Sequence, residues 1–242
     1  MHNQMNLIKK IIPFAIKRRV KEHLGVPSLH WSLCNLKKQH FYPKIILDIG
    51  AYEGLWTLAV LEVFPEAKVM MVEAQENKKA ALQEISNRHP GVKYSIALLS
   101  AAEGEQKLFR ENETGSQVIT ANEKDEKSYI LLSRQLDVLL EQEAFPYPDF
   151  LKLDVQNHEL EVLKGASKCL DHAEVCLLEV SLLNFGNAVP LLSEVAAFMK
   201  QRGFQAYDIS QLMRRPFDKA LFQLDMFFVK ESSPLVKSSR WI

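Results

Sequence analysis

Residues 45–54 read IILDIGAYEG, and this short run indicates the architecture of the whole chain. Its first five residues are mostly apolar, rich in isoleucine and bounded by Pro43 and Gly50, which predicts a buried strand. The glycine turn at its end opens an apolar run at 55–64, which predicts a helix that stops before Pro65. A strand, a tight turn and a helix in this order are typical of an α/β fold.

The same alternation continues along the chain. Further strands are predicted at 68–72, 92–98, 150–155, 174–180, 204–209 and 221–229, and helices at 77–87, 133–143, 158–170 and 189–202. The polar stretch at 103–127 predicts a hairpin and a loop. We therefore expect a doubly wound α/β fold with a mostly parallel, seven-stranded sheet and helices on both faces. No helix separates the last two strands, so the final strand is expected to run antiparallel.

The composition fits one folded domain. The chain has 242 residues, 47% of them hydrophobic, with 9 Gly and 10 Pro, which excludes the disordered and collagen-like classes. The apolar run at 11–16 is too short for a membrane span or for a signal peptide. Cys34, Cys169 and Cys176 form no CxxC pair, a pattern that favours a reduced, cytoplasmic protein.

Charge is distributed unevenly. The whole chain has 30 basic and 30 acidic side chains, which argues against general nucleic-acid binding. Residues 1–44 hold nine basic side chains against one acidic, or +8. We expect a basic, partly helical extension at 1–43, the folded domain at 44–230 and a C-terminal tail at 231–242. Three roles suit the extension: packing on its own domain, peripheral attachment to the inner face of an anionic membrane, or contact between copies of the chain.

The predicted strand ends carry residues that indicate a ligand. In an open α/β sheet, ligands bind beyond the carboxyl ends of the strands. Asp48 and Gly50 end the first strand, Glu73 ends the second and Asp154 the fourth. An acid at the end of the second strand is a usual acceptor for ribose hydroxyls, so these ends predict a nucleoside-containing cofactor.

The glycine turn discriminates between such cofactors. A dinucleotide needs G-x-G-x-x-G so that the backbone can approach its pyrophosphate, and here Tyr52 stands at the second glycine position. Glu53 adds negative charge to the helix start. S-adenosylmethionine has no phosphate, and its positive sulfonium suits Asp48 and Asp154. We therefore expect S-adenosylmethionine, with a plain strand-turn-helix as the alternative and a nicotinamide oxidoreductase disfavoured.

Residues 151–159, LKLDVQNHE, supply the candidate catalytic side chains. Strand alternation puts Lys152 and Asp154 on one face. Asp154 is expected to position the amino group of the cofactor or the hydroxyl of the acceptor. His158 is the candidate general base, with a surface or capping histidine as the alternative. No convergent set of ligands predicts a metal.

Three more acidic side chains and one loop residue lie near the predicted site. Glu159 and Glu161 are expected on an ordinary solvated helix face. Glu179 ends the fifth strand and either orients the acceptor or pairs with a cation. Ser116 lies in the long polar stretch and is expected in a lid over the site.

At this point the sequence resembles the FkbM family of S-adenosylmethionine-dependent methyltransferases. The segments that carry the resemblance are ILDIGAYEG (46–54), VEA (72–74), SRQLD (133–137), LKLDVQNHELEVLKGA (151–166), VCLLEV (175–180) and LDMFFVK (224–230). They occur in the family's order and cover nearly the whole expected domain. The resemblance implies the class I methyltransferase fold, which is Rossmann-like, and methylation of a hydroxyl on a sugar, a polysaccharide precursor or a secondary metabolite. The acceptor is then a small molecule or a glycan.

The family also implies roles for individual residues. Glu73 would hold the ribose, and Asp154 would lie beside the transfer site. The residues implied to hold the methionine part of the cofactor are Asp48, Gly50, Ala51 and Gly54. Asn157 stands where the family usually has glycine, and asparagine is the non-glycine residue that best adopts positive φ. Asn157 and the lack of a certain base leave one alternative, a scaffold protein that binds the cofactor without catalysis.

Overall fold

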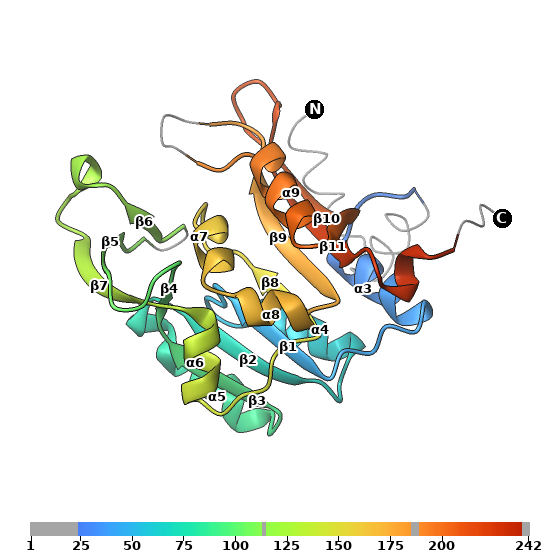
Figure 1. Cartoon of the computed structure of the whole chain (residues 1–242). Helices are drawn as coiled ribbons and strands as arrows, with labels where there is room; N and C mark the ends of the chain where they lie inside the picture. The colour runs from blue at the N-terminus through green and yellow to red at the C-terminus, as the bar shows by residue number, and fades with distance from the viewer. Residues whose placement is uncertain (1–23, 113–114, 185–188, 239–242) are drawn as a thin grey trace, which may run out of the picture.

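The computed structural model describes residues 24–112, 115–184 and 189–238 (Figure 1). Within these ranges the main layer is a seven-stranded sheet. Its strands, in spatial order, are β10 (Phe204–Arg214), β11 (Leu221–Lys230), β9 (Val175–Ser181), β8 (Phe150–Leu153), β1 (Ile45–Ile49), β2 (Lys68–Glu73) and β3 (Val92–Ile96). The pairs from β9 to β3 are parallel, whereas β11 is antiparallel to both of its neighbours. The predicted sheet and its antiparallel final strand are confirmed.

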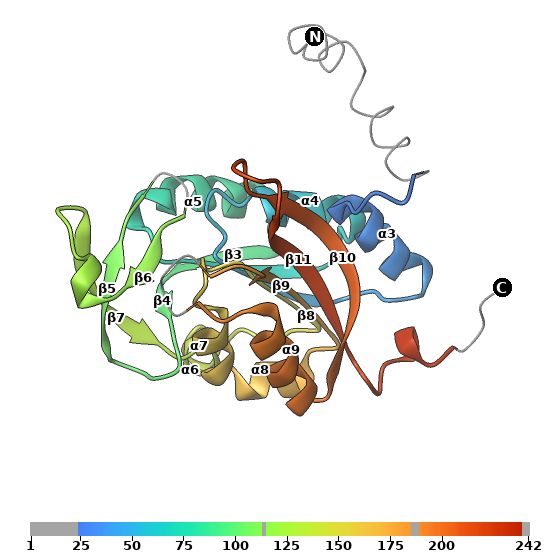
Figure 2. The same cartoon turned by 90° about the horizontal axis from the view of Figure 1, so that it is seen from above.

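Helices cover both faces of this sheet, as Figure 2 shows. One face carries α3 (Leu29–Lys38), α4 (Leu55–Val63) and α5 (Lys79–Arg88), and the other carries α6 (Leu136–Gln142), α7 (Glu159–Lys164), α8 (Ser167–His172) and α9 (Leu192–Gln201). Successive strand side chains point to opposite faces. Ile46 therefore packs in one apolar core, and Leu47 and Ile49 pack in the other.

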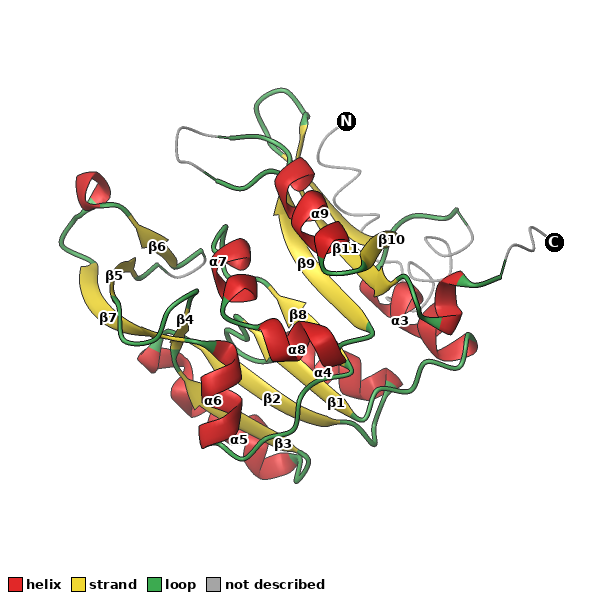
Figure 3. Ribbon diagram, in the orientation of Figure 1, coloured by secondary structure: helices red, strands yellow, loops and turns green. Residues whose placement is uncertain are grey.

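A second, small sheet lies beside the main one (Figure 3). Its strands, in spatial order, are β4 (Leu98–Leu99), β7 (Ser128–Arg134), β5 (Gln106–Arg110) and β6 (Gln117–Ile119). The antiparallel pair of β5 and β6 is the hairpin predicted within the polar stretch. The prediction of one strand over 92–98 is wrong, because β3 ends at Ile96 and β4 pairs with β7 instead.

Two of the predicted helices differ from the structure because of contacts with distant segments. The helix expected over 133–143 starts only at Leu136, because the buried Ser133 belongs to β7 and its N–H donates to the Glu105 carbonyl at 2.8 Å. The helix expected over 158–170 is two helices, α7 and α8. A Cβ at Gly165 would lie 2.3 Å from the Ser100 carbonyl oxygen, so the chain packs too closely there for any other residue.

The expected extension is described only from residue 24 onward. Within it, Leu33 and Leu36 of α3 are buried in the core on the α4 side of the sheet. Residues 1–23, which include most of the basic arm, lie outside the described residues. No described helix has the length and apolarity that crossing a membrane requires.

Candidate active site

A cavity of about 220 Å³ opens at the carboxyl ends of β1, β2 and β8. Gly50, Glu73 and Asp154 line it, one from each strand end. The small sheet contributes further lining side chains, among them Phe109 of β5 and Val118 of β6. This is the edge at which an open α/β sheet binds its ligand.

Gly50 brings the backbones of β1 and β8 together at this edge. Its φ is +74°, and a Cβ there would lie 1.8 Å from the carbonyl oxygen of Asp154. The N–H groups of Gly50 and Ala51 donate to the carbonyl of Val72 in β2, at 2.9 and 3.1 Å. Only glycine combines this φ with so close an approach. The turn is therefore held between its two neighbouring strands.

Ala51 and Gly54 shape the turn but do not line the cavity. Ala51 is buried in the core, and its carbonyl accepts the N–H of Gly54 at 2.7 Å. Gly54 has φ +75° and precedes α4, and a Cβ there would lie 2.4 Å from Cδ1 of Ile85. Of the four residues implied to hold the methionine part, Gly50 is the one that reaches the cavity.

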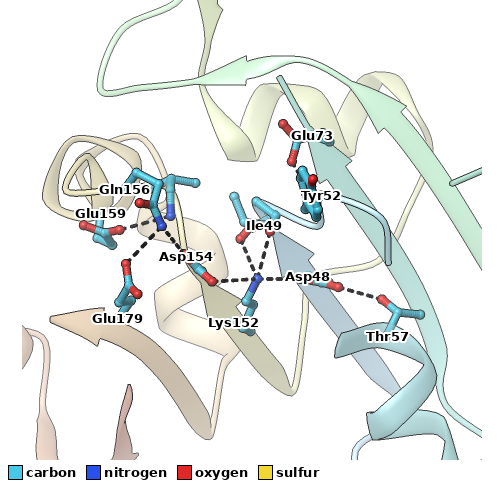
Figure 4. Close-up of polar contacts among 12 residues, drawn as sticks. Asp48, Ile49, Tyr52, Thr57, Glu73, Lys152, Asp154, Gln156, Glu159 and Glu179 are labelled. Atoms are coloured by element: carbon cyan, nitrogen blue, oxygen red, sulfur yellow. Dashed lines mark hydrogen bonds and ion pairs between the residues drawn. The ribbon is translucent and has the colours of Figure 1, made fainter. Parts of the chain in front are cut away.

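Glu73 presents a fixed carboxylate to the cavity. Its Oε2 accepts the backbone N–H of Tyr52 at 2.8 Å, and its Oε1 accepts that of Gln75 at 3.0 Å. Figure 4 shows Glu73 beside Tyr52. A carboxylate has about four lone-pair sites, so two remain after these bonds. Both hydroxyls of a ribose can therefore still donate to it.

Asp48 lies beneath the turn and does not line the cavity. It is fully buried; its Oδ2 accepts from Thr57 Oγ1 at 2.7 Å, and its Oδ1 lies 2.9 Å from Lys152 Nζ. Lys152 Nζ also donates to the Gly50 carbonyl at 2.9 Å. Burial alone would lower the pKa of Lys152, but the carboxylates of Asp48 and Asp154 outweigh it and raise the pKa. Lys152 thus stays charged and fixes the glycine turn (Figure 4).

Asp154 lies in the cavity lining and is held by an amide. Its Oδ1 accepts from Gln156 Nε2 at 3.0 Å, and the same nitrogen donates to Glu179 Oε2 at 3.2 Å. A second amide, Gln223 Nε2, also donates to Glu179 Oε2 at 3.2 Å. Burial, together with the charges of Asp154 and Glu159, raises the pKa of Glu179 above its usual range. Of the two alternatives for Glu179, pairing with a cation does not describe it, because its partners among the described residues are two amides.

The loop after β8 adopts two left-handed residues in succession. Gln156 has φ +55° and Asn157 has φ +71°. Asn157 therefore takes the positive φ that glycine allows, and its Oδ1 also accepts from Ser181 Oγ at 2.8 Å. Asn157 thus adopts, without glycine, the backbone conformation that favours glycine.

Glu159 holds this loop from within. Its Oε1 accepts the backbone N–H groups of Val155 and Asn157 at 3.0 and 3.2 Å. The expectation that Glu159 lies on a solvated helix face is wrong: it is 4% exposed. Burial raises the pKa of Glu159 to about 7 although the two N–H bonds oppose this. Glu161 does lie at the surface, paired with Lys164 at 2.5 Å.

His158 lines the cavity, and its side chain makes no capping bond to α7. Its Nε2 lies 3.0 Å from Ser100 Oγ. Burial lowers the pKa of His158 to about 4, so the imidazole is neutral at pH 7. The surface and capping alternatives therefore do not describe this histidine.

Ser116 and Gly115 also line the cavity, from the loop before β6. Ser116, expected in a lid over the site, thus lies at the cavity, and the lid itself stays a prediction. Three features of this site were not predicted from the sequence. They are the contacts of Lys152 with Asp48 and the Gly50 carbonyl, the ring of Phe109 in the lining, and the buried Gln75. Strand alternation had placed Lys152 beside Asp154, but it gave no sign of the partner Asp48. Among the described residues, no three His, Cys, Asp or Glu side chains are grouped to hold a metal ion.

Comparison with known families identifies the family of this chain. The family model of the methyltransferase FkbM domain matches residues 48–206, more than half of the chain. This chain belongs to the FkbM methyltransferase family. The family is S-adenosylmethionine-dependent, so S-adenosylmethionine is the cofactor of this FkbM methyltransferase.

Several solved methyltransferases are similar to it at low sequence identity. An FkbM methyltransferase from Methylobacillus flagellatus has 16% identity and TM-score 0.46, covering 76% of this chain and 43% of its own. Fibrillarin from Aeropyrum pernix with bound S-adenosyl-L-methionine has 12% identity and TM-score 0.47, covering 77% and 66%. The 1,6-didemethyltoxoflavin-N1-methyltransferase of Burkholderia thailandensis has 14% identity and TM-score 0.46, covering 95% and 89%. This chain thus spans less than half of the first protein. No curated protein matches it.

Proposed function

We propose that this FkbM methyltransferase transfers a methyl group from S-adenosylmethionine to a hydroxyl of a sugar, a polysaccharide precursor or a secondary metabolite. The observation that carries this proposal is the cavity lining. It contains the carboxylates of Glu73 and Asp154 and, among the described residues, no Lys or Arg. Such a lining suits a cationic cofactor without phosphate. Burial keeps His158 neutral at pH 7, so it has an unprotonated ring nitrogen at the same cavity.

Two parts of the cofactor, the ribose and the methionine part, have a matching carboxylate at the cavity. Glu73 would accept the two ribose hydroxyls, since it has two lone-pair sites left. Gly50, without a side chain, keeps the turn packed against β8, so that the turn and Asp154 line one cavity. Asp154 would accept from the amino group of the methionine part or hold the acceptor hydroxyl. When bound, S-adenosylmethionine supplies a methyl group activated by its sulfonium.

The protein's own contribution is alignment and a proton acceptor. Aligning a nucleophile with the methyl group is worth about 7–11 kcal/mol of the barrier. A hydroxyl is a poor nucleophile and needs a base. In the tautomer whose Nε2–H donates to Ser100 Oγ, Nδ1 of His158 keeps its lone pair and takes the hydroxyl proton. The carbon–oxygen bond forms as the carbon–sulfur bond breaks.

The test uses S-adenosylmethionine labelled in its methyl group, with fractionated bacterial glycans and small alcohols as acceptors. We expect label in a methyl ether, which survives mild alkali that hydrolyses methyl esters. His158→Ala should lower turnover about 10²- to 10⁴-fold while S-adenosylhomocysteine still binds. Label on nitrogen, or label released by alkali, would contradict the proposed O-methylation. Unchanged turnover of His158→Ala near neutral pH would remove the base assignment alone.

A further inference from the structure

The connection between β10 and β11 presents large apolar side chains to solvent. Phe217 is 91% exposed, and Leu212 and Met213, near the end of β10, are 43% and 42% exposed. Single exposed apolar residues are ordinary on a protein surface, but three within one short hairpin indicate an interaction site. We call residues 212–219 the hairpin tip.

Hydrogen bonds close the hairpin tip. Arg215 Nε donates to Asp218 Oδ1 at 2.6 Å, and the backbone N–H of Ala220 donates to the same oxygen at 2.9 Å. The N–H of Arg215 donates to the Ala220 carbonyl at 3.0 Å. Cζ of Arg215 lies 5.7 Å from the centre of the Phe217 ring. Because the turn is already formed, little conformational freedom is lost when Phe217 meets a partner.

The hairpin tip is also positively charged. It holds three basic side chains against one acidic, or +2. The acidic residue, Asp218, is paired with Arg215 at 2.5 Å. Arg214 donates to the Lys219 carbonyl at 2.9 Å, and neither Arg214 nor Lys219 has an ion-pair partner among the described residues. Two cations beside an exposed aromatic ring suit a partner with an anionic surface and an apolar interior.

This hairpin tip lies at the edge of the sheet that holds the cavity. β11 is antiparallel to both β9 and β10, so β10 runs in the same direction as β9 and β8. β10 therefore ends, at Arg214, on the carboxyl edge where the cavity opens. Figure 1 shows the β10–β11 connection projecting past the end of β9.

We propose that the hairpin tip inserts into the interface of an anionic lipid bilayer, with Phe217 at the boundary of the acyl chains and Arg214 and Lys219 at the lipid phosphates. Phenylalanine and leucine on one side with Lys and Arg on the other is the composition that binds such an interface. The carboxyl edge of the sheet then faces the bilayer. This inference goes beyond the proposed methyl transfer and does not rest on it.

The first test measures partitioning of the full chain onto vesicles of phosphatidylglycerol and phosphatidylcholine by sedimentation at low salt. Phe217→Ser should weaken partitioning about 10-fold, because it removes the apolar group that enters the interface. Replacement of both Arg214 and Lys219 by Gln should weaken it about 25-fold, or about fivefold for each cation.

Two controls remove the same chemistry elsewhere. Leu132→Ser deletes a side chain that is 62% exposed on β7. The double variant Lys68→Gln and Lys93→Gln removes two exposed cations near the amino ends of β2 and β3, at the opposite edge of the sheet. Both controls should partition as the wild type does. All four variants change exposed side chains and should melt as the wild type does.

A direct contact is measured with Phe217→Trp and brominated lipids. The chain has three Trp of its own, so wild-type quenching is subtracted. We expect added quenching and emission at shorter wavelength in the variant. Absence of added quenching, or unchanged partitioning of Phe217→Ser, would overturn the proposal even where residues 1–23 bind the vesicles. Unchanged partitioning with fewer copies per particle for Phe217→Ser in light scattering would assign the hairpin tip to a second copy of the chain instead.

Discussion

Glu159 is a carboxylate held away from water, and its titration should be visible in the stability of the protein. Its pKa is raised from 4.5 to about 7 by burial. The folded state therefore binds more protons than the unfolded state between these values, so the free energy of unfolding falls as pH rises through that window. Glu159→Gln retains an Oε1 acceptor for both loop N–H groups. We expect it to be more stable than wild type above pH 7, by about 3 kcal/mol.

Denaturant unfolding at pH 4.5 and pH 8 measures this difference. Glu161→Gln is the matched control, because Glu161 is at the surface two positions along the same helix. It should leave the pH dependence unchanged. A Glu159→Gln variant that is less stable than wild type at pH 8 would show that the charge of Glu159 stabilises the loop.

Asp48 and Asp154 show how far single residues could be predicted. Both follow apolar runs, so their strand-end positions were readable from the sequence. Their different surroundings were not, because these depend on which strands are neighbours. The register of β1 and β8 sets Asp48 opposite Lys152, which gives Asp48 a buried cation. Asp154, two residues on from Lys152, lies at the cavity, and its Oδ2 is 3.9 Å from the same Nζ. No local pattern contains that pairing.

At the scale of elements, the turn after β1 depends on the absence of a side chain. Gly50→Ala would place a Cβ against the Asp154 carbonyl, so β1 and β8 would have to separate at the cavity. Gly104→Ala is the matched control, because Gly104 has φ +75° and a Cβ there would meet no atom within 4 Å. Both variants bear the left-handed penalty of about 1–2 kcal/mol. We expect only Gly50→Ala to lose S-adenosylhomocysteine binding.

Thermal melting with and without S-adenosylhomocysteine separates these effects. Bound ligand at 100 times its dissociation constant should stabilise wild type and Gly104→Ala by about 2.7 kcal/mol. Normal stabilisation of Gly50→Ala would mean that the turn tolerates the displacement and that close packing with β8 is not required for binding.

Element types were more predictable than element ends. The strands of the main sheet were found because long apolar runs record burial on both faces. The ends of α6 and α7 depend on contacts with distant segments. Ser133 bonds to the chain near Glu105, and Gly165 packs on Ser100. Local periodicity contains neither contact. The prediction therefore started α6 too early and joined α7 and α8 into one helix.

At the scale of the whole molecule, the charge asymmetry of the chain predicts where it associates. Residues 1–23 contain six basic side chains and one acidic. We expect the full chain to sediment with vesicles containing phosphatidylglycerol at low salt, and less so at high salt, because exposed charges are screened. Removal of residues 1–23 should reduce sedimentation. Vesicles of phosphatidylcholine alone are the control.

Light scattering of the same two proteins checks the competing roles of the arm. Equal vesicle binding by both, with fewer copies per particle for the shortened protein, would assign the arm to contact between copies. A lower melting temperature alone would assign it to packing on its own domain.

The order of the strands has a consequence for how the protein is made. β11, the last strand in the sequence, lies between β9 and β10, and β10 pairs with no other strand of the described chain. During synthesis β10 therefore leaves the ribosome before its partner exists, and β9 presents an open edge until residue 230 has emerged. The nascent chain can form the cofactor edge of β1, β2 and β8 first. The main sheet is complete only when β11 has inserted between β9 and β10.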